Sequence, residues 1–420
     1  MKYDWYVFDL DGTLTESGDG IINSAKFALD ELGVPCPSDA ELRKFIGPPL
    51  LWSFETVARL DEKTARRAVE IDNARYAEAG WKENRVYTGI PHLLRGIKKR
   101  GGHLAVASAK PEKFVTRIME FFGLAPYFDR VAGAHSDEEM DKKELILSAL
   151  PPDADPSRAV MVGDRQYDID GALRAGVTPV AAEYGYGAPG EFAEAKYSAK
   201  TVDDLWDILI GEEKDRGFFV TFEGGDGCGK STQFAMAAEY FARRGWDVVT
   251  SREPGGCYIS ERIRDILLDT ASAGMTYECE AMLYAAARQQ HVAQVILPAV
   301  GSGKLLLCDR FLDSSIAYQA YGRELTEDFI RQINKPAVGD LSPDMTLLYT
   351  VDAETARARV ARGGAPDRIE AEGDDFVARL NRGYAILAER ESGRIRTLDA
   401  ARAIDAVFAD TSRHIAELLS

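Results

Sequence analysis

Residues 218–231 read Phe-Phe-Val-Thr-Phe-Glu-Gly-Gly-Asp-Gly-Cys-Gly-Lys-Ser, an apolar run that leads directly into a glycine-rich loop. The loop Gly224–Ser231 matches the pattern GxxxxGK[ST], and helix-like sequence follows from about Lys230. In that context, backbone amides surround the phosphates of a nucleotide, with Lys230 as counter-charge and Ser231 as a ligand of Mg²⁺. The stretch therefore predicts a strand, loop and helix that bind a nucleoside triphosphate.

Short apolar runs alternate with amphipathic segments along the whole chain, a pattern typical of parallel α/β sheets. The runs expected to form buried strands are Trp5–Phe8, Leu104–Ala107, Ala159–Val162, Val177–Ala181, Phe218–Phe222, Asp247–Thr250, Leu305–Cys308 and Met345–Val351. Because the runs form two series that each open with a polar loop motif, we predict two doubly wound domains, residues 1–210 and 218–420. The charged stretch 211–217 is the expected linker, and residues 16–84, which lack a convincing strand, are expected to be a helical insertion.

The composition limits the classes of partner. The chain has 420 residues, and 51 Lys and Arg against 68 Asp and Glu give a formal net charge of −17. Such a charge repels polyanions, so neither nucleic acid nor a membrane surface is an expected partner. The five cysteines are scattered with no CxxC pair, which argues against a structural zinc site or a disulfide framework. With no apolar run long enough to span a membrane and no signal-like start, we expect a soluble, cytoplasmic protein.

Paired aspartates follow the first apolar run. Asp9 and Asp11 are two residues apart, so they project to the same side of an extended segment, and such a pair favours a shared Mg²⁺. Other polar groups end later strands of the same series or open the helices there: Ser108, Lys142, Lys143, Asp164 and Asp168. Since the carboxyl ends of parallel strands converge on one crevice, these groups are expected to form one site suited to phosphoryl transfer.

With these motifs in this order, residues 1–209 resemble the haloacid dehalogenase superfamily of phosphatases, a Rossmann-like fold. The resemblance implies that Asp9 attacks phosphorus to form an aspartyl-phosphate, and that Asp11 protonates the leaving oxygen and later activates water. Ser108 and Lys142 would hold the phosphoryl oxygens, although the neighbouring Lys143 is an alternative. The implied metal ligands are Asp9, Asp11, Asp164 and Asp168.

The helical insertion resembles the small cap of that superfamily. Its segment Phe45–Leu50 is similar to one found in phosphoglycolate phosphatases and related nucleotidases. The substrate expected for this half is a phosphate monoester, either phosphoglycolate or a nucleoside monophosphate.

Three motifs, at residues 222–233, 252–256 and 309–311, make residues 217–420 resemble bacterial thymidylate kinases, which have a P-loop kinase fold. The resemblance implies that ATP donates a phosphoryl group to dTMP. The implied ATP-binding residues are Gly224, Gly225, Asp226, Gly227, Cys228, Gly229, Lys230, Ser231 and Thr232. Ser231 and Asp309 are the implied metal ligands in this half.

The same resemblance implies a dTMP site made of Asp226, Arg252, Tyr284, Arg288, Arg310, Ser315, Tyr318 and Gln319. Arg252 and Arg310 would hold the acceptor phosphate, Tyr284 and Arg288 would contact the base, and Tyr318 would lie beneath the deoxyribose. Residues 359–368 resemble the lid of these kinases, with Arg362 or Arg368 as the cation that stabilises the transition state. Such kinases commonly form homodimers, so a homodimer is expected.

The leading hypothesis is a bifunctional enzyme, a Mg²⁺-dependent phosphatase fused to an ATP-dependent dTMP kinase. One alternative makes the first half a non-catalytic module that regulates the kinase or aids its dimerisation. Another makes the kinase half a nucleotide sensor. The complete set of acidic, hydroxyl and cationic groups in both halves favours two catalytic sites.

Overall fold

The computed structural model describes residues 2–46, 50–134, 141–360, 368–369 and 372–420. The chain divides into two compact units, one comprising Met1–Glu213 and Arg243–Gly245, the other Lys214–Ala242 and Trp246–Ser420. Within the described ranges, no helix has both the length and the hydropathy needed to cross a bilayer. The cytoplasmic location expected from the sequence stays a prediction.

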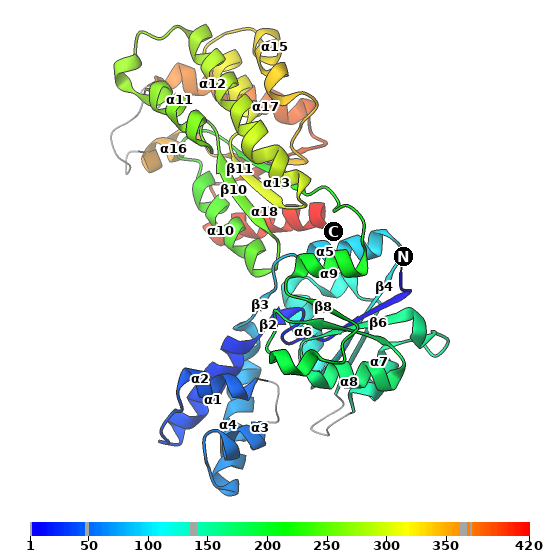
Figure 1. The fold of residues 1–420 in the computed structure, drawn as a ribbon. Helices are drawn as coiled ribbons and strands as arrows, with labels where there is room; N and C mark the ends of the chain where they lie inside the picture. Colours follow the sequence, from blue (N-terminus) through cyan, green and yellow to red (C-terminus); the bar gives the residue numbers. More distant parts are fainter. Residues whose placement is uncertain (1, 47–49, 135–140, 361–367, 370–371) are drawn as a thin grey trace. The chain divides into compact units, whose positions relative to one another are not determined.

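A six-stranded parallel sheet forms the centre of the first unit, in the order β5-β4-β1-β6-β7-β8 (Figure 1). Its strands are β1 (Trp5–Phe8), β4 (His103–Pro111), β5 (Arg130–Ala134), β6 (Ala159–Gly163), β7 (Thr178–Ala182) and β8 (Tyr197–Ala199). The helices that accompany them are α5 (Ile90–Lys99), α6 (Glu112–Phe122), α7 (Lys142–Ala149), α8 (Gln166–Ala175) and α9 (Val202–Leu209). Val7 of β1 is paired with Ala105 of β4 and with Met161 of β6. The end of β1 is therefore central to the edge at which such a sheet holds a ligand.

The side chains of β1 alternate between two buried layers, because successive residues of a strand point to opposite faces. Tyr6 and Phe8 belong to the core that includes residues of α5, α6 and α9. Val7 belongs to a separate core with Leu145 of α7 and Ala172 of α8. Helices thus cover both faces of the sheet, as in a doubly wound fold.

A helical insertion separates β1 from β4. It consists of α1 (Gly18–Glu31), α2 (Asp39–Leu42), α3 (Leu50–Thr56) and α4 (Glu62–Glu78). Two short strands, β2 (Thr15–Glu16) and β3 (Arg85–Val86), pair antiparallel where the insertion leaves and rejoins the sheet domain. Its helices group to one side of the sheet in Figure 1 and enclose their own apolar core, with Leu29, Phe45 and Phe54 at its centre.

A five-stranded parallel sheet forms the centre of the second unit, in the order β10-β11-β9-β12-β13. Its strands are β9 (Phe218–Glu223), β10 (Val248–Arg252), β11 (Leu305–Asp309), β12 (Met345–Thr350) and β13 (Ile395–Asp399). The helices are α10 (Lys230–Arg243), α11 (Tyr258–Leu268), α12 (Tyr277–His291), α13 (Leu297–Gly301), α14 (Leu312–Ser315), α15 (Glu327–Val338), α16 (Ala353–Val360), α17 (Asp374–Arg390) and α18 (Ile404–Leu419). Two π-helical segments extend helices of this unit, Val292–Ile296 after α12 and Ile316–Gly322 after α14.

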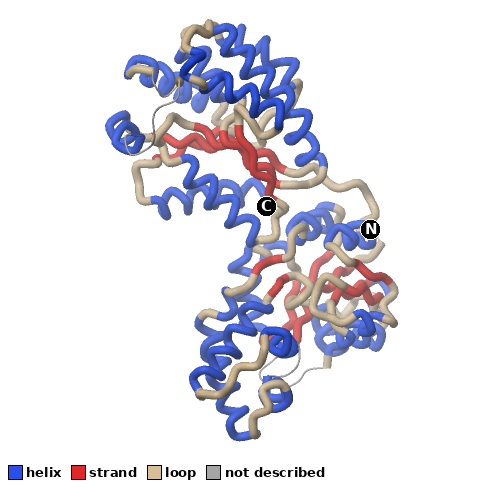
Figure 2. The backbone as a smooth tube through the Cα atoms, turned by 60° about the vertical axis from the view of Figure 1, so that its left-hand side comes forward, coloured by secondary structure: helices blue, strands red, loops and turns tan. Residues whose placement is uncertain are grey.

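Helices cover both faces of this second sheet as well (Figure 2). Val220 and Phe222 of β9 pack in a core with Phe241 of α10 and Ile415 of α18. Phe219, between them in sequence, packs on the opposite face in a core that includes Val300 of α13. The central strand β9 therefore carries the loop that follows it to the middle of the sheet edge.

Both parallel α/β sheets predicted from the sequence are confirmed, and every predicted run overlaps a strand. The strands that the sequence pattern did not indicate are β5, β8 and β13, all at the edges of their sheets. An edge strand has one neighbour and more contact with solvent, so its sequence need not be continuously apolar. The short helix α3 and the β2–β3 pair were also not predicted.

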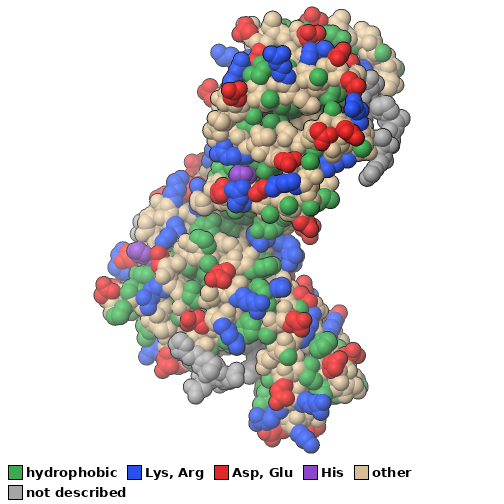
Figure 3. Space-filling model, turned by 180° about the vertical axis from the view of Figure 1, so that it is seen from behind, with side chains coloured by type: hydrophobic (Ala, Val, Ile, Leu, Met, Phe, Trp, Pro, Cys, Tyr) green, Lys and Arg blue, Asp and Glu red, His purple; other side chains and the backbone are tan. Residues whose placement is uncertain are grey.

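Charged side chains of both signs are interspersed over the face of each unit that Figure 3 shows.

Candidate active sites

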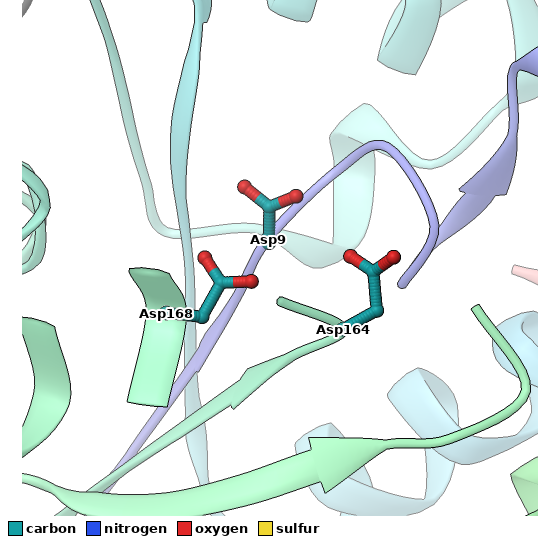
Figure 4. A group of neighbouring side chains, drawn as sticks. All are labelled: Asp9, Asp164 and Asp168. Carbon is teal, nitrogen blue, oxygen red and sulfur yellow. The ribbon is translucent and has the colours of Figure 1, made fainter. Parts of the chain in front are cut away.

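Three aspartates meet at the carboxyl end of the first sheet. Asp9 follows β1, Asp164 follows β6, and Asp168 lies in the first turn of α8. Each offers a carboxylate oxygen within 4.8 Å of the others, and all three are buried. Figure 4 shows their carboxylates pointing to the same side. Because Mg²⁺ prefers carboxylate oxygens, this donor set fits the metal ion that the sequence predicts.

Lys142 supplies the positive charge among these acids. Its Nζ lies 2.6 Å from Oδ1 of Asp9 and 2.6 Å from Oδ1 of Asp168. The side chain is only 1% exposed, whereas the neighbouring Lys143 is half-buried. Of the two lysines that the sequence left open, Lys142 is the one that contacts the acids.

One ammonium does not offset all the negative charge in this buried space. Burial, reinforced by Asp168 and Asp9, raises the pKa of Asp164 to about 8. Burial also raises the pKa of Asp9 above its ordinary range, although Lys142 opposes that shift. A cation bound at the cluster would favour the ionised forms of Asp9 and Asp164. This is a second reason why the three acids fit Mg²⁺.

Asp11 lies outside the three-acid cluster and contacts a different lysine. Its Oδ2 is 3.1 Å from Nζ of Lys110, which also donates a hydrogen bond of 2.6 Å to the hydroxyl of Tyr76 on α4. Asp11 therefore stays a predicted metal ligand, and it also stays a candidate for proton transfer. Tyr76 belongs to the insertion, so this chain of contacts joins the insertion to the site.

Gly12 and Ser108 complete the immediate surroundings. Gly12 has a φ of +82°, and a Cβ there would lie 2.1 Å from Oδ2 of Asp164, so only glycine fits. Ser108 is 2% exposed on β4, the strand beside β1, and its Oγ accepts a hydrogen bond from the amide of Lys110. Its predicted contact with the phosphoryl group is compatible with this position and stays a prediction.

In the second unit, the loop between β9 and α10 surrounds an open pocket of about 340 Å³. The pocket is lined by Gly225, Asp226, Gly227, Cys228, Gly229, Lys230, Ser231, Thr232 and Arg359. Lys230 forms an ion pair with Asp309 at the end of β11. The predicted ATP loop, its lysine and the acid expected to assist the metal are therefore in one place.

Arg310 lies against this loop. Its Nη1 donates to the carbonyl of Gly224 at 2.9 Å and its Nη2 to Oδ1 of Asp226 at 2.8 Å. Its backbone is left-handed, with a φ of 72°, a conformation that a non-glycine residue adopts only where neighbours impose it. The buried Glu223 lies beside this turn, and its Oε1 accepts a hydrogen bond from the amide of Phe311 at 2.7 Å. Sequence reasoning missed Glu223, although a carboxylate that ends a buried strand is a usable signal.

Two residues of the predicted dTMP site have buried hydroxyls. Ser315 is 3% exposed and Tyr318 is 8% exposed. Neither hydroxyl has a hydrogen-bond partner within the described part of the chain. The guanidinium of Arg310 lies over the ring of Tyr318, with Cζ 4.9 Å from the ring centre. The contacts of Ser315 and Tyr318 with dTMP stay a prediction.

The remaining predicted dTMP residues differ in their surroundings. Arg288 is buried, and its guanidinium donates to Glu253, to Asn334 and to the carbonyl of Phe311. Gln319 donates to Glu280 at 3.1 Å, and Arg252 pairs with Glu261 at 2.9 Å. Tyr284 is half-buried on α12. The base contact expected of Arg288 stays a prediction, since protein groups already occupy its donors.

The lid arginines fall in three different situations. Arg362 lies outside the described residues. Arg368 is directed to the buried Glu280, with Nη2 2.7 Å from Oε2, and to the carbonyl of Leu267. Arg359 lines the ATP pocket, and its Nη1 lies 3.4 Å from the carbonyl of Gly227. Sequence reasoning quoted Arg359 within the lid but gave it no role, because helical sequence does not show which arginine faces the loop.

Comparisons with known proteins match the two units separately. A family model described as thymidylate kinase matches residues 222–411. The thymidylate kinase of Pelotomaculum thermopropionicum is 47% identical over 205 residues, which is 49% of this chain and 95% of the relative. That of Finegoldia magna is 44% identical over 191 residues, 46% of this chain and 94% of the relative.

The C-terminal half of the chain belongs to the thymidylate kinase family.

The N-terminal half matches a family model described as haloacid dehalogenase-like hydrolase over residues 6–182. Among solved structures, a predicted phosphatase from Clostridium acetobutylicum is 37% identical and covers 50% of this chain and all of its own, with a TM-score of 0.47. A thymidylate kinase from Ehrlichia chaffeensis is 30% identical and covers 48% of this chain and 98% of its own, with a TM-score of 0.39. The chain is a thymidylate kinase domain fused to a haloacid dehalogenase-like hydrolase domain, hereafter the kinase unit and the hydrolase unit.

The raised pKa of Asp164 predicts how metal binding depends on pH. When folding raises the pKa of an acid, the folded state loses stability as the pH rises from the pKa in the unfolded chain to the pKa in the folded chain. For Asp164 this loss extends up to about pH 8. A cation that binds the ionised form reverses this loss. Mg²⁺ alone should therefore raise the unfolding temperature of the hydrolase unit more at about pH 8 than at about pH 6.

Differential scanning calorimetry of the full chain measures this shift, and the transition that ATP moves identifies the kinase unit. Asp164→Asn should lose the response to Mg²⁺. Asp170→Asn, which removes a carboxylate from the following helix α8, should keep it. An equal shift at both pH values, or a full response in Asp164→Asn, would contradict the assignment.

Proposed function

We propose that the chain is a bifunctional enzyme that phosphorylates dTMP to dTDP with ATP and hydrolyses a phosphate monoester through an aspartyl-phosphate. The observation that supports this most is that each unit gathers its own phosphate chemistry at the carboxyl edge of its own sheet. In the hydrolase unit this is the set Asp9, Lys142, Asp164 and Asp168, and in the kinase unit it is the loop pocket beside Arg310.

In the kinase unit, an oxygen of the dTMP phosphate would attack the γ-phosphorus of ATP, and ADP would leave. The loop amides and Lys230 would hold the ATP phosphates, and Arg310 and Arg252 would hold the acceptor phosphate. In the structure these cations pair with Asp309, Asp226 and Glu261. Phosphate groups would exchange with these carboxylates, so the clamp is assembled in advance. Mg²⁺, held by Ser231 and Asp309, would neutralise charge on the ATP phosphates.

The buried hydroxyls of Ser315 and Tyr318 support a nucleoside ligand. A buried polar atom without a partner is unfavourable, so a ligand that bonds both hydroxyls removes that cost. The Tyr318 ring beneath the sugar would leave little room for a 2′-hydroxyl, which favours the deoxyribose. A base that offers carbonyl groups to Arg288 would require the guanidinium to exchange one of its present partners.

Arg359 joins Arg362 and Arg368 as a candidate for the cation of the lid. Its guanidinium is already at the mouth of the ATP pocket, whereas Arg368 is paired with Glu280. We place Arg359 first for contact with bound ATP, and we keep Arg362 and Arg368 as candidates for the transition state.

In the hydrolase unit, Asp9 would attack phosphorus, and the bond to the ester oxygen would break as Asp11 gives that oxygen a proton. Asp11 would then accept a proton from water, which attacks the aspartyl-phosphate and releases inorganic phosphate. Lys142 and Ser108 would hold phosphoryl oxygens during both steps. Mg²⁺, held by Asp9, Asp164 and Asp168, would offset the charge between these acids and the phosphate.

The alternative, a hydrolase unit that regulates the kinase without catalysis, is less well supported. Buried like charges are costly, and a unit without catalytic use for them gains nothing by keeping three acids within 4.8 Å. The position of Lys110 between Asp11 and Tyr76 also links the insertion to the catalytic groups.

We also propose that the kinase unit forms homodimers. An exposed apolar stripe runs at helical spacing along α12, its π-helical extension and the start of α13, through Cys279, Met282, Ala286, Ala293 and Leu297. Met282 is 51% exposed and Leu297 is 53% exposed. Association through this stripe would remove it from water. Membership of the thymidylate kinase family, whose resemblance implies homodimers, supports a second copy as the partner.

For the kinase, ATP and dTMP should give ADP and dTDP, with kcat/KM for dTMP about tenfold or more above that for dCMP. A single unsatisfied hydrogen bond in a buried site has an effect of that size. Arg310→Ala should lower kcat/KM by about 10³-fold, as the loss of other phosphoryl-clamping arginines does. The exposed Arg331→Ala is the control. Comparable turnover of dCMP and dTMP would contradict the assignment of thymidylate as substrate.

For the hydrolase, Asp11→Asn should trap the aspartyl-phosphate. With p-nitrophenyl phosphate and Mg²⁺, the nitrophenolate leaves without needing a proton, but water is no longer activated. We expect one burst of nitrophenolate and a gain in protein mass of one phosphoryl group, measured by intact-mass spectrometry. Asp9→Asn should show neither, and chelation of Mg²⁺ should abolish both in Asp11→Asn. Phosphate release from the wild type with no mass gain in Asp11→Asn would contradict the covalent route.

A further inference from the structure

The inner face of α4 in the insertion carries an acid. Its buried residues are Ala65, Ala68 and Asp72, which follow one another at helical spacing. The charged residues Glu62, Arg66 and Glu70 on the same helix are exposed, whereas Asp72 is only 3% exposed. A carboxylate in the position of a core residue is unfavourable unless something bonds to it.

No such partner is present for one oxygen of this carboxylate. Within the described ranges, Oδ1 of Asp72 has neither a hydrogen-bond donor nor contact with solvent. Burial raises the pKa of Asp72 to about 7, and the nearby cations Arg75 and Lys110 oppose that shift without cancelling it. Arg75 is itself engaged in a two-bond ion pair with Glu83, at 2.6 and 2.8 Å.

Asp72 is on the side of α4 that faces the catalytic groups. It precedes Tyr76 by one helical turn, so the two side chains share a face. The Tyr76 hydroxyl accepts from Lys110, and Lys110 pairs with Asp11. Asp11 is the candidate donor of a proton to the leaving oxygen. Asp72 is thus beside the groups that would meet the organic part of the ester, not beside those that hold its phosphate.

The charges around this space disfavour a second anion. The described acids are Asp9, Asp11, Asp72, Asp164 and Asp168, and the described ammonium groups are Lys110 and Lys142. Two guanidinium groups also act on these acids, Arg75 on Asp72 and Arg165 on Asp164. Arg75 is paired with Glu83, and Arg165 is paired with Glu191. Both ammonium groups already contact carboxylates. A bound Mg²⁺ would be engaged with the phosphate and its own ligands. A substrate carboxylate near Asp72 would therefore lack a free cation, whereas a hydroxyl would find a free acceptor.

We propose that Asp72 sets the substrate class of the hydrolase unit by accepting a hydrogen bond from a hydroxyl of the ester's organic part and by excluding esters that carry a carboxylate there. The proposal rests on the hydrolysis proposed above. It distinguishes between the two substrates left open by the sequence: hydroxyl-bearing monoesters, nucleoside monophosphates among them, are substrates, and phosphoglycolate is disfavoured.

A matched pair of esters tests this inference in the full chain with Mg²⁺. Phosphoglycolate and ethylene glycol monophosphate have the same length and differ in a terminal carboxylate against a terminal hydroxyl. We expect wild-type kcat/KM to favour the hydroxyl ester by about tenfold or more. Asp72→Asn should shift that ratio towards phosphoglycolate by about tenfold, because it removes the repulsion and keeps the shape. Glu70→Gln removes an exposed carboxylate from the same helix and should leave the ratio unchanged.

The outcomes separate the inference from the function on which it rests. A wild-type preference for phosphoglycolate overturns the inference, and this measurement needs no variant to fold. An unchanged ratio in folded Asp72→Asn, verified by its unfolding temperature, overturns it as well. If the wild type releases no nitrophenolate from p-nitrophenyl phosphate, the proposed hydrolysis fails and the inference fails with it.

Discussion

Charge buried at the edge of a parallel sheet must be offset by opposite charge, and both units are organised by this constraint. The strands of such a sheet end together, so residues distant in sequence bring their charges into one small space. In the hydrolase unit the excess is negative, and Lys142 bridges Asp9 and Asp168. In the kinase unit the groups proposed to be catalytic are cations, and carboxylates pair with them: Lys230 with Asp309, and Arg310 with Asp226. Each site thus has the charge pattern that a phosphate, with or without its metal ion, would complete.

The two units meet the same chemical problem in different ways. A hydrolase that forms a covalent intermediate needs a nucleophile. The proposed nucleophile, Asp9, lies at the end of β1 beside Lys142, in the three-acid cluster proposed to hold Mg²⁺. A kinase transfers the phosphoryl group directly to its second substrate, so it needs donors and cations around the two phosphates. The loop pocket and Arg310 are the groups proposed to supply these. The charge that has to be offset therefore has the opposite sign in the two units.

The sequence was sufficient for the parts of the molecule that follow from local patterns. Central strands such as β1 and β9 are continuous apolar runs because both of their faces are buried, and the residues that end them, Asp9 and the loop after Glu223, could be placed from that alone. The edge strands β8 and β13 could not, because their sequences mix polar and apolar residues. The charged stretch 211–217 was identified as a linker from its composition. The division between the two units falls within this stretch, after Glu213. Its role as a linker stays a prediction.

The site was predictable in its motif residues and not in its tertiary contacts. Spacing identified Asp164, Asp168 and the pair Lys142–Lys143, but only packing shows which lysine contacts the acids. The contact of Tyr76 with Lys110 joins residues that are 34 positions apart on different elements, and no local pattern indicates it. The burial of Asp72 could not be predicted either. Its spacing from Ala65 and Ala68 is that of a core position, which an apolar residue usually fills.

The central claim is that one chain carries two catalytic sites that do not depend on each other, and a cross-test of two substitutions examines it most directly. Phosphate release and dTDP formation are measured in Asp9→Asn and in Lys230→Ala at saturating Mg²⁺. The account predicts that each substitution abolishes the activity of its own unit and changes the other by less than about twofold. A loss of more than about tenfold in the other activity, roughly 1.4 kcal/mol of barrier, would contradict two independent sites.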